Sequence, residues 1–188
     1  MSWSLEVDNV EPYGYVKKAF TVEECNKIIE YGNSKQEIEG TIEKTNLNYS
    51  VRKSKIAWLP QEEQSQWIYQ KLADCIYEAN KAFFNFDLWG MAEDLQFTKY
   101  EVGSVHKAHI DLSYKQRIRK LTVVVQLTDE KEYDGGELNL MYQPYPVSMD
   151  KTQGTLIIFP SYTLHEVMPL TRGKRYSLVS WVTGNQFK

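Results

Sequence analysis

The chain has 188 residues, 42% of them hydrophobic and 13% aromatic, which is enough for a folded core and excludes a disordered segment. The net charge of −3 without a long basic stripe argues against a nucleic-acid-binding protein, although one short basic run extends from Lys115 to Lys120. No apolar run has membrane-spanning length, and the first residues lack the blocks of a signal peptide. We therefore expect a cytoplasmic protein with no membrane partner, in which residues 1–188 form one domain.

Two amphipathic helices are predicted in the first half of the chain. Thr21 and Glu24 have the spacing of a capping box, which predicts a helix that runs towards Gly32. A second helix of about five turns is predicted after Pro60, because apolar residues recur at three- and four-residue spacing. These residues are Ile68, Leu72, Ile76, Ala79 and Phe83. We expect the apolar faces of both helices to cover a sheet.

From about residue 94 the pattern changes to short strands with no helical crossover between them. Apolar and polar residues alternate in 95–100 and 121–128, and further strand-like runs occupy 137–142, 154–159 and 175–182. Such a series is typical of an antiparallel sandwich or jelly roll. The predicted fold is α+β: a double-stranded β-helix (jelly-roll) core of about 94–184, with an N-terminal helical part of about 1–93 packed on one sheet. Trp58, Trp67 and Trp89 are expected to be core aromatics.

His109, Asp111 and His165 have the residue types of a metal site, and Arg175 follows ten residues after the second histidine. In an extended strand alternate residues share a face, so His109 and Asp111 can point the same way. Two histidines and one carboxylate form a facial triad that suits non-haem Fe(II) and leaves coordination positions open. Arg175 offers a rigid fork for the far carboxylate of 2-oxoglutarate. The set predicts an iron- and 2-oxoglutarate-dependent oxygenase.

Several motifs resemble the prolyl 4-hydroxylase family of the 2-oxoglutarate/Fe(II)-dependent dioxygenases, from about residue 20 to the end of the chain. Tyr100-Glu-Val-Gly103 ahead of His109-Ile-Asp111 is similar to the family's approach to its iron ligands, and Tyr133-Asp-Gly-Gly-Glu-Leu138 is similar to its glycine turn. His165 and Arg175 match the distal ligand and the cation. Upstream, the segment from Arg52 to Leu59 resembles an R-x-S…W-L segment of collagen-type and bacterial members.

This resemblance implies a role for each of eight residues. His109, Asp111 and His165 would bind iron, while Arg175 and Tyr100 would bind 2-oxoglutarate. Trp181 matches an aromatic placed near the substrate proline, Arg52 lies in a segment that borders the peptide groove, and His106 stands where the family has an aromatic substrate contact. Because histidine is smaller than tyrosine and can titrate, the departure at His106 leaves the identity of the substrate open.

The resulting hypothesis is a dioxygenase that hydroxylates an unactivated C–H bond, with peptidyl proline as the expected target. Fe(II), 2-oxoglutarate and O2 are the implied cofactor and co-substrates, and ascorbate is the implied reductant. Residues 40–56 and the basic run after Asp111 are expected to border an extended peptide, and the first of these segments to close over it. Two alternatives stay open: the same chemistry on a small molecule or free amino acid, and a catalytically silent jelly-roll binding module.

Overall fold

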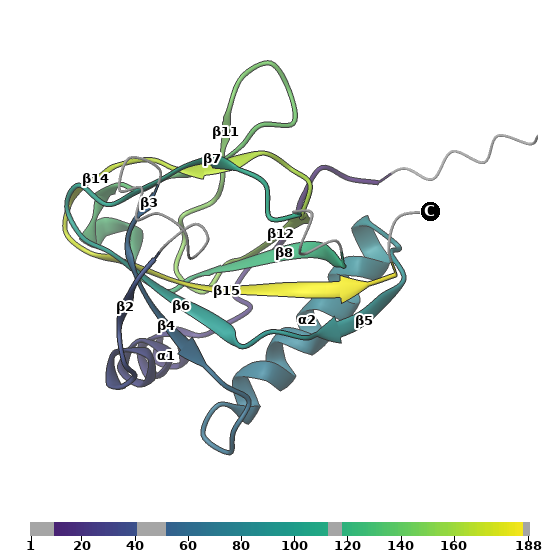
Figure 1. Cartoon of the computed structure of the whole chain (residues 1–188), viewed down its shortest axis with the longest axis horizontal. Coiled ribbons are helices and arrows are strands. Elements are labelled where there is room, and N and C mark those ends of the chain that lie inside the picture. Colours follow the sequence, from purple (N-terminus) through teal and green to yellow (C-terminus); the bar gives the residue numbers. More distant parts are fainter. Residues whose placement is uncertain (1–9, 41–51, 113–117, 186–188) are drawn as a thin grey trace, which may run out of the picture.

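Figure 1 shows the computed structural model of the chain, which describes residues 10–40, 52–112 and 118–185. The helices are α1 (Val22–Ser34) and α2 (Gln66–Phe83), with a short 3-10 turn at Glu130–Glu132. The strands are β1 (Gly14–Val16), β2 (Ile38–Glu39), β3 (Arg52–Lys53), β4 (Lys55–Leu59), β5 (Leu88–Met91), β6 (Leu95–Tyr100), β7 (Val105–His109), β8 (Arg119–Gln126), β9 (Asp134–Gly135), β10 (Leu138–Leu140), β11 (Val147–Ser148), β12 (Leu156–Pro160), β13 (His165–Val167), β14 (Leu170–Arg172) and β15 (Arg175–Gly184).

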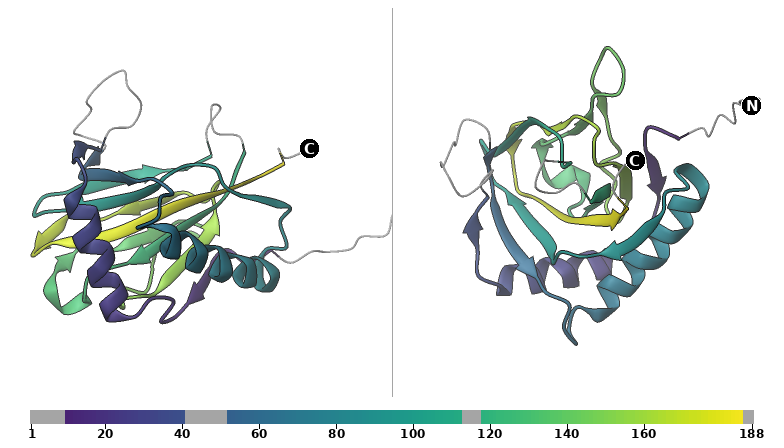
Figure 2. Two further views of the ribbon diagram at one scale, coloured as in Figure 1. Left: turned by 90° about the horizontal axis from the view of Figure 1, so that it is seen from below. Right: turned by 45° about the vertical axis from the view of Figure 1, so that its right-hand side comes forward.

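Within these described ranges the strands form two facing sheets and a small separate pair. The larger sheet has eight strands in the order β1-β12-β8-β15-β6-β4-β2, with β5 paired to the end of β15. The smaller sheet has the order β11-β10-β13-β7-β3, and β14 pairs with β9. Every described pairing is antiparallel. The strands therefore wrap around a common interior, seen end-on in the right-hand view of Figure 2.

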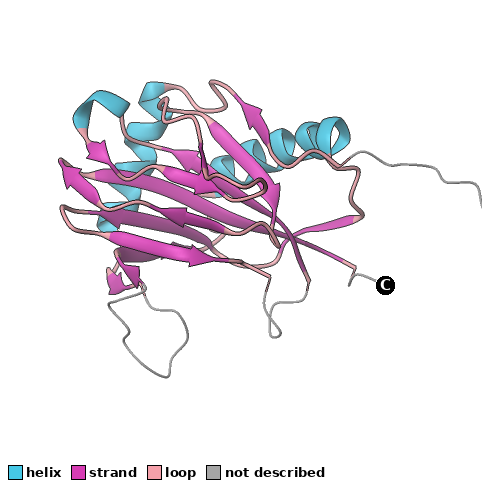
Figure 3. Ribbon diagram, turned by 90° about the horizontal axis from the view of Figure 1, so that it is seen from above, coloured by secondary structure: helices cyan, strands magenta, loops and turns pink. Residues whose placement is uncertain are grey.

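The two helices cover the outer face of the larger sheet, as predicted, and Figure 3 shows them behind the strands. The capping box is present: Glu24 N–H donates to Thr21 Oγ1 at 3.2 Å, and Thr21 N–H donates to a Glu24 carboxylate oxygen at 2.7 Å. Helix α1 approaches the sheet closely at Gly32, where a Cβ would lie 2.5 Å from the ring of Phe97. Larger side chains at Gly32 would push the helix away from the core.

Alternation along the strands of the larger sheet separates two apolar clusters. Residues that face the helices, such as Phe97, Val123 and Leu178, belong to a core completed by α1 and α2. Their sequence neighbours on the opposite face, such as Val124 and Tyr100, belong to a second cluster between the two sheets. The polar residues of the candidate site share this second face, because period-two alternation assigns each strand residue to one side or the other.

Two details of the sequence-based interpretation are wrong. Trp58 is 37% exposed and Trp89 is 62% exposed, so neither is a core aromatic, whereas Trp67 is partly buried against the helix-side core. In β4 the side chains of Ala57 and Leu59 take the helix-side positions, and alternation directs Trp58 to the other face. The N-terminal part is also less helical than expected, because β1 to β5 all precede residue 94. The expectation of one domain over residues 1–188 stays a prediction.

The cysteines, the helices and the segments expected to border a peptide complete the description of the fold. Cys25 and Cys75 are both free, and burial raises the pKa of the Cys25 thiol to about 11. Neither α1 nor α2 combines the length and the apolar character needed to cross a membrane. Of the two segments expected to border a peptide, residues 41–51 and 113–117 lie outside the described ranges, so the expected closure over substrate stays untested.

Candidate metal centre

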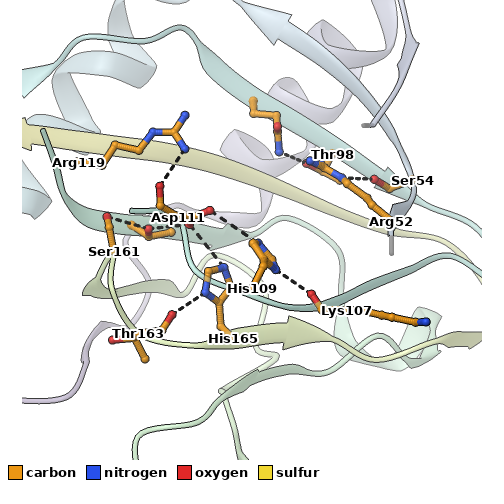
Figure 4. A network of polar contacts seen from close by, with 12 residues as sticks. Arg52, Ser54, Thr98, Lys107, His109, Asp111, Arg119, Ser161, Thr163 and His165 are labelled. Carbon is orange, nitrogen blue, oxygen red and sulfur yellow. Dashed lines mark hydrogen bonds and ion pairs between the residues drawn. The ribbon is translucent and has the colours of Figure 1, made fainter. Parts of the chain in front are cut away.

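Three side chains meet at the end of the interior where β7 ends and β13 begins (Figure 4). His109 is the last residue of β7 and His165 the first of β13, and the two are paired across the smaller sheet. Asp111 follows in the turn after β7. Its carboxylate oxygens lie 3.7 Å from His109 Nε2 and 3.5 Å from His165 Nε2. One ligand atom from each residue lies within 4.8 Å of the others, a spacing that can hold a metal ion.

Both histidines are oriented by backbone carbonyls. His109 Nδ1 lies 2.8 Å from the carbonyl oxygen of Lys107, and His165 Nδ1 lies 2.9 Å from that of Thr163. When Nδ1 donates to a carbonyl, the lone pair is on Nε2, which in both residues faces the cluster. Histidines that bind metals characteristically have such an outer partner, which fixes the tautomer and the direction of the ring.

Asp111 is held equally firmly. Thr122 on β8 donates its hydroxyl to Asp111 Oδ2 at 2.8 Å and lies 3.1 Å from the hydroxyl of Ser161, while the Asp111 N–H donates to the Ser161 carbonyl at 3.0 Å. Burial alone would raise the pKa of the Asp111 carboxyl, but His165 and His109, together with Trp181 and Thr122, lower it below its usual value. The carboxylate is therefore charged and available as a ligand.

His109 and its neighbour His106 are neutral. Burial lowers the pKa of His109 to about 4, and burial with the charge of Arg52 lowers the pKa of His106 further below its ordinary value. The His106 ring stacks on the His109 ring at a centroid distance of 3.7 Å, and its Nε2 is buried without a hydrogen-bond partner in the described part of the chain. Neutral imidazoles are the form that binds a metal ion.

Arg175 occupies the interior from the larger sheet, whereas His109 and His165 belong to the smaller one. It is the first residue of β15, it pairs with Tyr100 on β6, and its guanidinium lies 5.0 Å from the centre of the Tyr100 ring. Only 1% of Arg175 is exposed. Its Nη2 donates to Gln126 Oε1 at 2.9 Å, while Nε and Nη1 are buried without a partner among the described residues. A buried guanidinium with two unused donors is costly unless an anion binds there.

Tyr133 lies next to this cation. Its ring is 1% exposed, its hydroxyl makes no hydrogen bond within the described ranges, and the Lys151 ammonium lies 4.4 Å from the ring centre. Burial raises the pKa of Tyr133, and the charge of Arg175 offsets part of that rise. The neutral hydroxyl is thus a further unused donor beside Arg175, and the two side chains together can receive a carboxylate.

The three residues expected to contact substrate lie around the metal cluster. Arg52 on β3 is paired with His106 on β7, and its Nε donates to Ser54 Oγ at 2.9 Å. Trp181 on β15 is 7% exposed and paired with Thr122. On its indole ring lies the Arg119 guanidinium, 3.9 Å from the ring centroid. The structure therefore brings all eight residues singled out from the sequence to the interior between the two sheets.

Residues 95–183 match the family model of the 2OG-Fe(II) oxygenase superfamily. The likeness to this superfamily covers slightly less than half of the chain. All the predicted site residues except Arg52 lie inside the matched stretch. It is also similar to named hydroxylases: it is 38% identical over 88 residues to a PKHD-type hydroxylase of Synechococcus sp. (strain JA-2-3B'a(2-13)) and 37% identical over 93 residues to one of Paracoccus denitrificans. These alignments cover 44% and 45% of the chain but only 39% and 40% of the relatives, so the chain spans about two fifths of their length.

Solved structures confirm the predicted fold of this chain. A prolyl hydroxylase from Trichoplax adhaerens, in complex with a hypoxia inducible factor oxygen degradation domain peptide fragment, has a TM-score of 0.78 at 20% identity over 93% of this chain and 84% of that one. A Pseudomonas putida prolyl-4-hydroxylase has a TM-score of 0.73 at 18% identity over 93% of this chain and 94% of that one. At such low identity the likeness shows the fold: a jelly-roll core with helices on one sheet.

Four residues of this candidate site were missed by the sequence reasoning: Gln126, Thr122, Tyr133 and Arg119. Gln126 and Thr122 lie at alternate positions of a strand that was recognised, so a polar pair on one face of an otherwise apolar run was the available signal. Tyr133 stood inside a quoted motif. Arg119 lies within the basic run, where its pairing with Glu93 at 2.6 Å could not be seen from the sequence.

The Thr122 hydroxyl provides a test of how the Asp111 carboxylate is positioned. We expect Thr122→Val to weaken Fe(II) binding by about 10- to 100-fold, because the isosteric change removes only the hydrogen bond that orients Asp111. Thr155→Val is the matched control, since the Thr155 hydroxyl is buried but makes no hydrogen bond in the described structure. Anaerobic calorimetric titration of Fe(II) measures both, and equal affinities of the two variants would contradict the role of Thr122.

The depressed histidine pKa values predict an acid-sensitive fold. The pKa of His109 is lowered from 6.5 to about 4, and that of His106 is also lowered from 6.5. Just below pH 6.5 the two histidines are therefore protonated in the unfolded chain but not in the folded chain. The free energy of unfolding of the metal-free protein should not be reduced by these histidines above pH 6.5. Below that it should fall by up to about 1.4 kcal/mol per pH unit for each histidine, until the folded pKa is reached. Urea denaturation between pH 7.5 and 5 measures the slope, which should be shallower in His106→Gln.

Proposed function

We propose that this chain is an Fe(II)- and 2-oxoglutarate-dependent dioxygenase that hydroxylates an unactivated C–H bond, with peptidyl proline as the substrate class. The observation that supports this most strongly is that one interior contains both a cluster of possible metal ligands and a buried cation with unused hydrogen-bond donors. A carboxylate and two histidines converge with their ligand atoms within 4.8 Å, and farther in Arg175 is buried with two unused donors. A metal ion would bind to the cluster, and the far carboxylate of 2-oxoglutarate would accept hydrogen bonds from Arg175.

His109, Asp111 and His165 fit iron because two imidazoles and one carboxylate leave the remaining positions of an octahedral ion open. With iron bound, O2 and 2-oxoglutarate would be converted to succinate and CO2, and one oxygen atom would enter the substrate C–H bond as a hydroxyl group. The protein residues bind, orient and shield. The hydrogen bonds at Nδ1 of the two histidines and at Asp111 Oδ2 keep the three ligand atoms facing the same point.

Arg175, Tyr100 and Gln126 would bind and align the co-substrate. Thr122, which contacts the metal cluster, and Gln126, which contacts Arg175, are four residues apart on the same face of β8. Their backbones are therefore about 13 Å apart. The side chains of Asp111 and Arg175 reach inwards from the two ends, and a five-carbon dicarboxylate can fill the remaining length. A shorter diacid would leave one of the two ends without its partner.

The same chemistry on a free amino acid has one observation in its favour. Arg52 is partly buried beside His106, its Nε donates to Ser54, and no carboxylate forms an ion pair with it among the described residues. The carboxylate of a free amino acid would pair with it, as would a peptide carbonyl more weakly. A silent binding module is disfavoured, because the three ligands and the cation are all in place. A nucleic-acid substrate has no comparable support.

The test is anaerobic titration of Fe(II) in the presence of 2-oxoglutarate, followed by the visible metal-to-ligand charge-transfer band. We expect the wild-type protein to develop the band and His109→Ala to lack it at the same concentrations. Arg175→Ala should develop it only at much higher 2-oxoglutarate, because the iron ligands are intact but the far carboxylate has lost its partner. Absence of a band in the wild-type protein at any concentration would refute the proposal.

Ascorbate as reductant, a proline-containing peptide as partner and the cytoplasm as location are the finer parts of the proposal. The peptide is supported by analogy alone, since it is the Trichoplax prolyl hydroxylase that was solved with a peptide. Once the band is established, succinate release in the presence of peptides or of free proline separates the two substrate classes. The oligomeric state plays no part in this assignment.

A further inference from the structure

The exposed indole of Trp58 continues the candidate site towards solvent. Trp58 lies on β4 and is paired with Gln96 on β6, which is paired with Val179 on β15. Paired residues share a face of a sheet, so Trp58 is on the same face as Trp181, two residues beyond Val179. The two indole rings are in contact, with centroids 6.3 Å apart and planes tilted by 45°. Trp181 in turn is paired with Thr122, whose hydroxyl donates to the iron-ligand candidate Asp111.

The inner end of this aromatic pair is fixed by a neutralised cation. The Arg119 guanidinium lies 3.9 Å from the centre of the Trp181 ring, and its Nε donates to Glu93 at 2.6 Å. Its Nη1 lies 3.5 Å from the backbone carbonyl of Asp111. Trp181 is therefore immobilised and almost fully buried, whereas Trp58 keeps 37% of its surface exposed. An exposed indole on a rigid support is suited to stacking against a ring of a bound molecule.

We propose that Trp58 is a second substrate subsite, which binds a proline ring two residues away from the residue that is hydroxylated in an extended, uncharged peptide segment. This inference rests on the proposed function, since it takes the residue beside Trp181 as the target. The spacing supports it: residues i and i+2 of an extended or polyproline chain are roughly 6 to 7 Å apart, close to the separation of the two indoles.

The electrostatics of the subsite favour a neutral occupant. The cation that lies on Trp181, Arg119, is already paired with Glu93, so its charge is not available to a phosphate or a carboxylate. A nucleobase could stack on Trp58, but its phosphates would have to compete with Glu93 for Arg119. A proline ring brings apolar C–H groups to the indole face and no charge. The substrate motif that fits is Pro-x-Pro with small neutral neighbours.

The experiment is a double-mutant cycle between Trp58 and the second proline. Two peptides with blocked termini, Ala-Ala-Pro-Ala-Pro-Ala-Ala and Ala-Ala-Pro-Ala-Ala-Ala-Ala, are titrated calorimetrically without oxygen, with and without Fe(II) and 2-oxoglutarate. Wild-type protein should bind the two-proline peptide about 5- to 10-fold more tightly than the one-proline peptide. Trp58→Ala should bind the two peptides with equal affinity, and Trp58→Phe should keep part of the preference for the two-proline peptide.

Trp89→Ala is the matched control, because Trp89 is an exposed tryptophan of the same sheet but has no ring contact with Trp181. It should retain the full ratio. The subsite is refuted if the ratio is unchanged in Trp58→Ala, if Trp58→Ala weakens both peptides equally, or if wild-type protein binds neither peptide. Binding of a ten-residue oligothymidylate that depends on Trp58, without peptide binding, would identify a base platform instead.

These outcomes are separable from failure of the proposed function. The peptide titrations do not require the iron chemistry, and the charge-transfer band does not require peptide. A band with an unchanged peptide ratio refutes the Trp58 subsite and leaves the oxygenase standing. A Trp58-dependent ratio without a band supports a proline-peptide-binding face and refutes the oxygenase. Thermal melting of Trp58→Ala, together with the band that it forms, verifies that the variant is folded.

Discussion

Gln126→Glu should weaken 2-oxoglutarate binding by at least about a hundredfold, because the new carboxylate would pair with Arg175 in place of the co-substrate. Gln126 and Arg175 are each 1% exposed, so the internal ion pair would be shielded from water. The same substitution should raise the melting temperature of the ligand-free protein, since it supplies a counter-charge to a buried cation. Calorimetric titration of 2-oxoglutarate and a thermal melt measure the two effects.

Gln126→Met is the matched control for this prediction. It removes the hydrogen bond that orients the Arg175 fork but adds no charge, so 2-oxoglutarate binding should weaken by no more than about tenfold. Gln126→Met should lower the melting temperature, whereas Gln126→Glu should raise it. These opposite signs distinguish charge compensation from simple loss of packing. If Gln126→Glu bound 2-oxoglutarate as the wild-type protein does, Arg175 would not be the partner of the co-substrate.

Gly135→Ala should destabilise the fold by about 2 to 3 kcal/mol, because two penalties combine at this position. Gly135 has a φ of +75°, which disfavours any side chain, and a Cβ there would lie 2.2 Å from the carbonyl oxygen of Pro169. This turn joins β9 to the segment that contains Gly136, whose own Cβ position lies 3.2 Å from Arg175 Cδ. The substitution should therefore also reduce affinity for 2-oxoglutarate.

Gly103→Ala separates the two penalties. Gly103 has a similar φ of +81°, but a Cβ there would meet only the end of the Lys53 side chain at 3.6 Å. We expect it to cost about 1 kcal/mol, the backbone term alone, and to leave co-substrate binding unchanged. Urea denaturation of the two variants gives the difference. Equal destabilisation would show that the close approach of Pro169 is relieved by a small shift of the turn.

The features predictable from the sequence were those that depend on local pattern. The capping box at Thr21 and the three- and four-residue spacing in the second helix predicted α1 and α2 because helix periodicity is set by nearest neighbours along the chain. The candidate ligands His109 and Asp111 were recognisable for the same reason: two residues apart, they act as one short motif. Arg175 was recognisable from its strand-like context and from the family resemblance.

The features that could not be predicted depend on register between strands. The contact between Gln126 and Arg175 exists because Ser177 pairs with Gln126 across β8 and β15, and no local pattern specifies that alignment. Exposure of Trp58 likewise follows from the way β4 is joined to the sheet: alternation gives two faces, but the chain sequence does not say which of them the helices cover. A tryptophan amid apolar neighbours was therefore taken for a core residue.

The strand order of the larger sheet has a consequence for how the fold can be divided. The segment that matches the superfamily, residues 95–183, holds the metal ligands, but β1 closes one edge of its sheet and β4 with β2 closes the other. Without the preceding residues, β12 and β6 would become bare edges, and the apolar face of Leu121, Val123 and Val125 would lose its helical cover. The matched segment is thus not an autonomous folding unit: expressed alone, we expect it to self-associate through exposed strands.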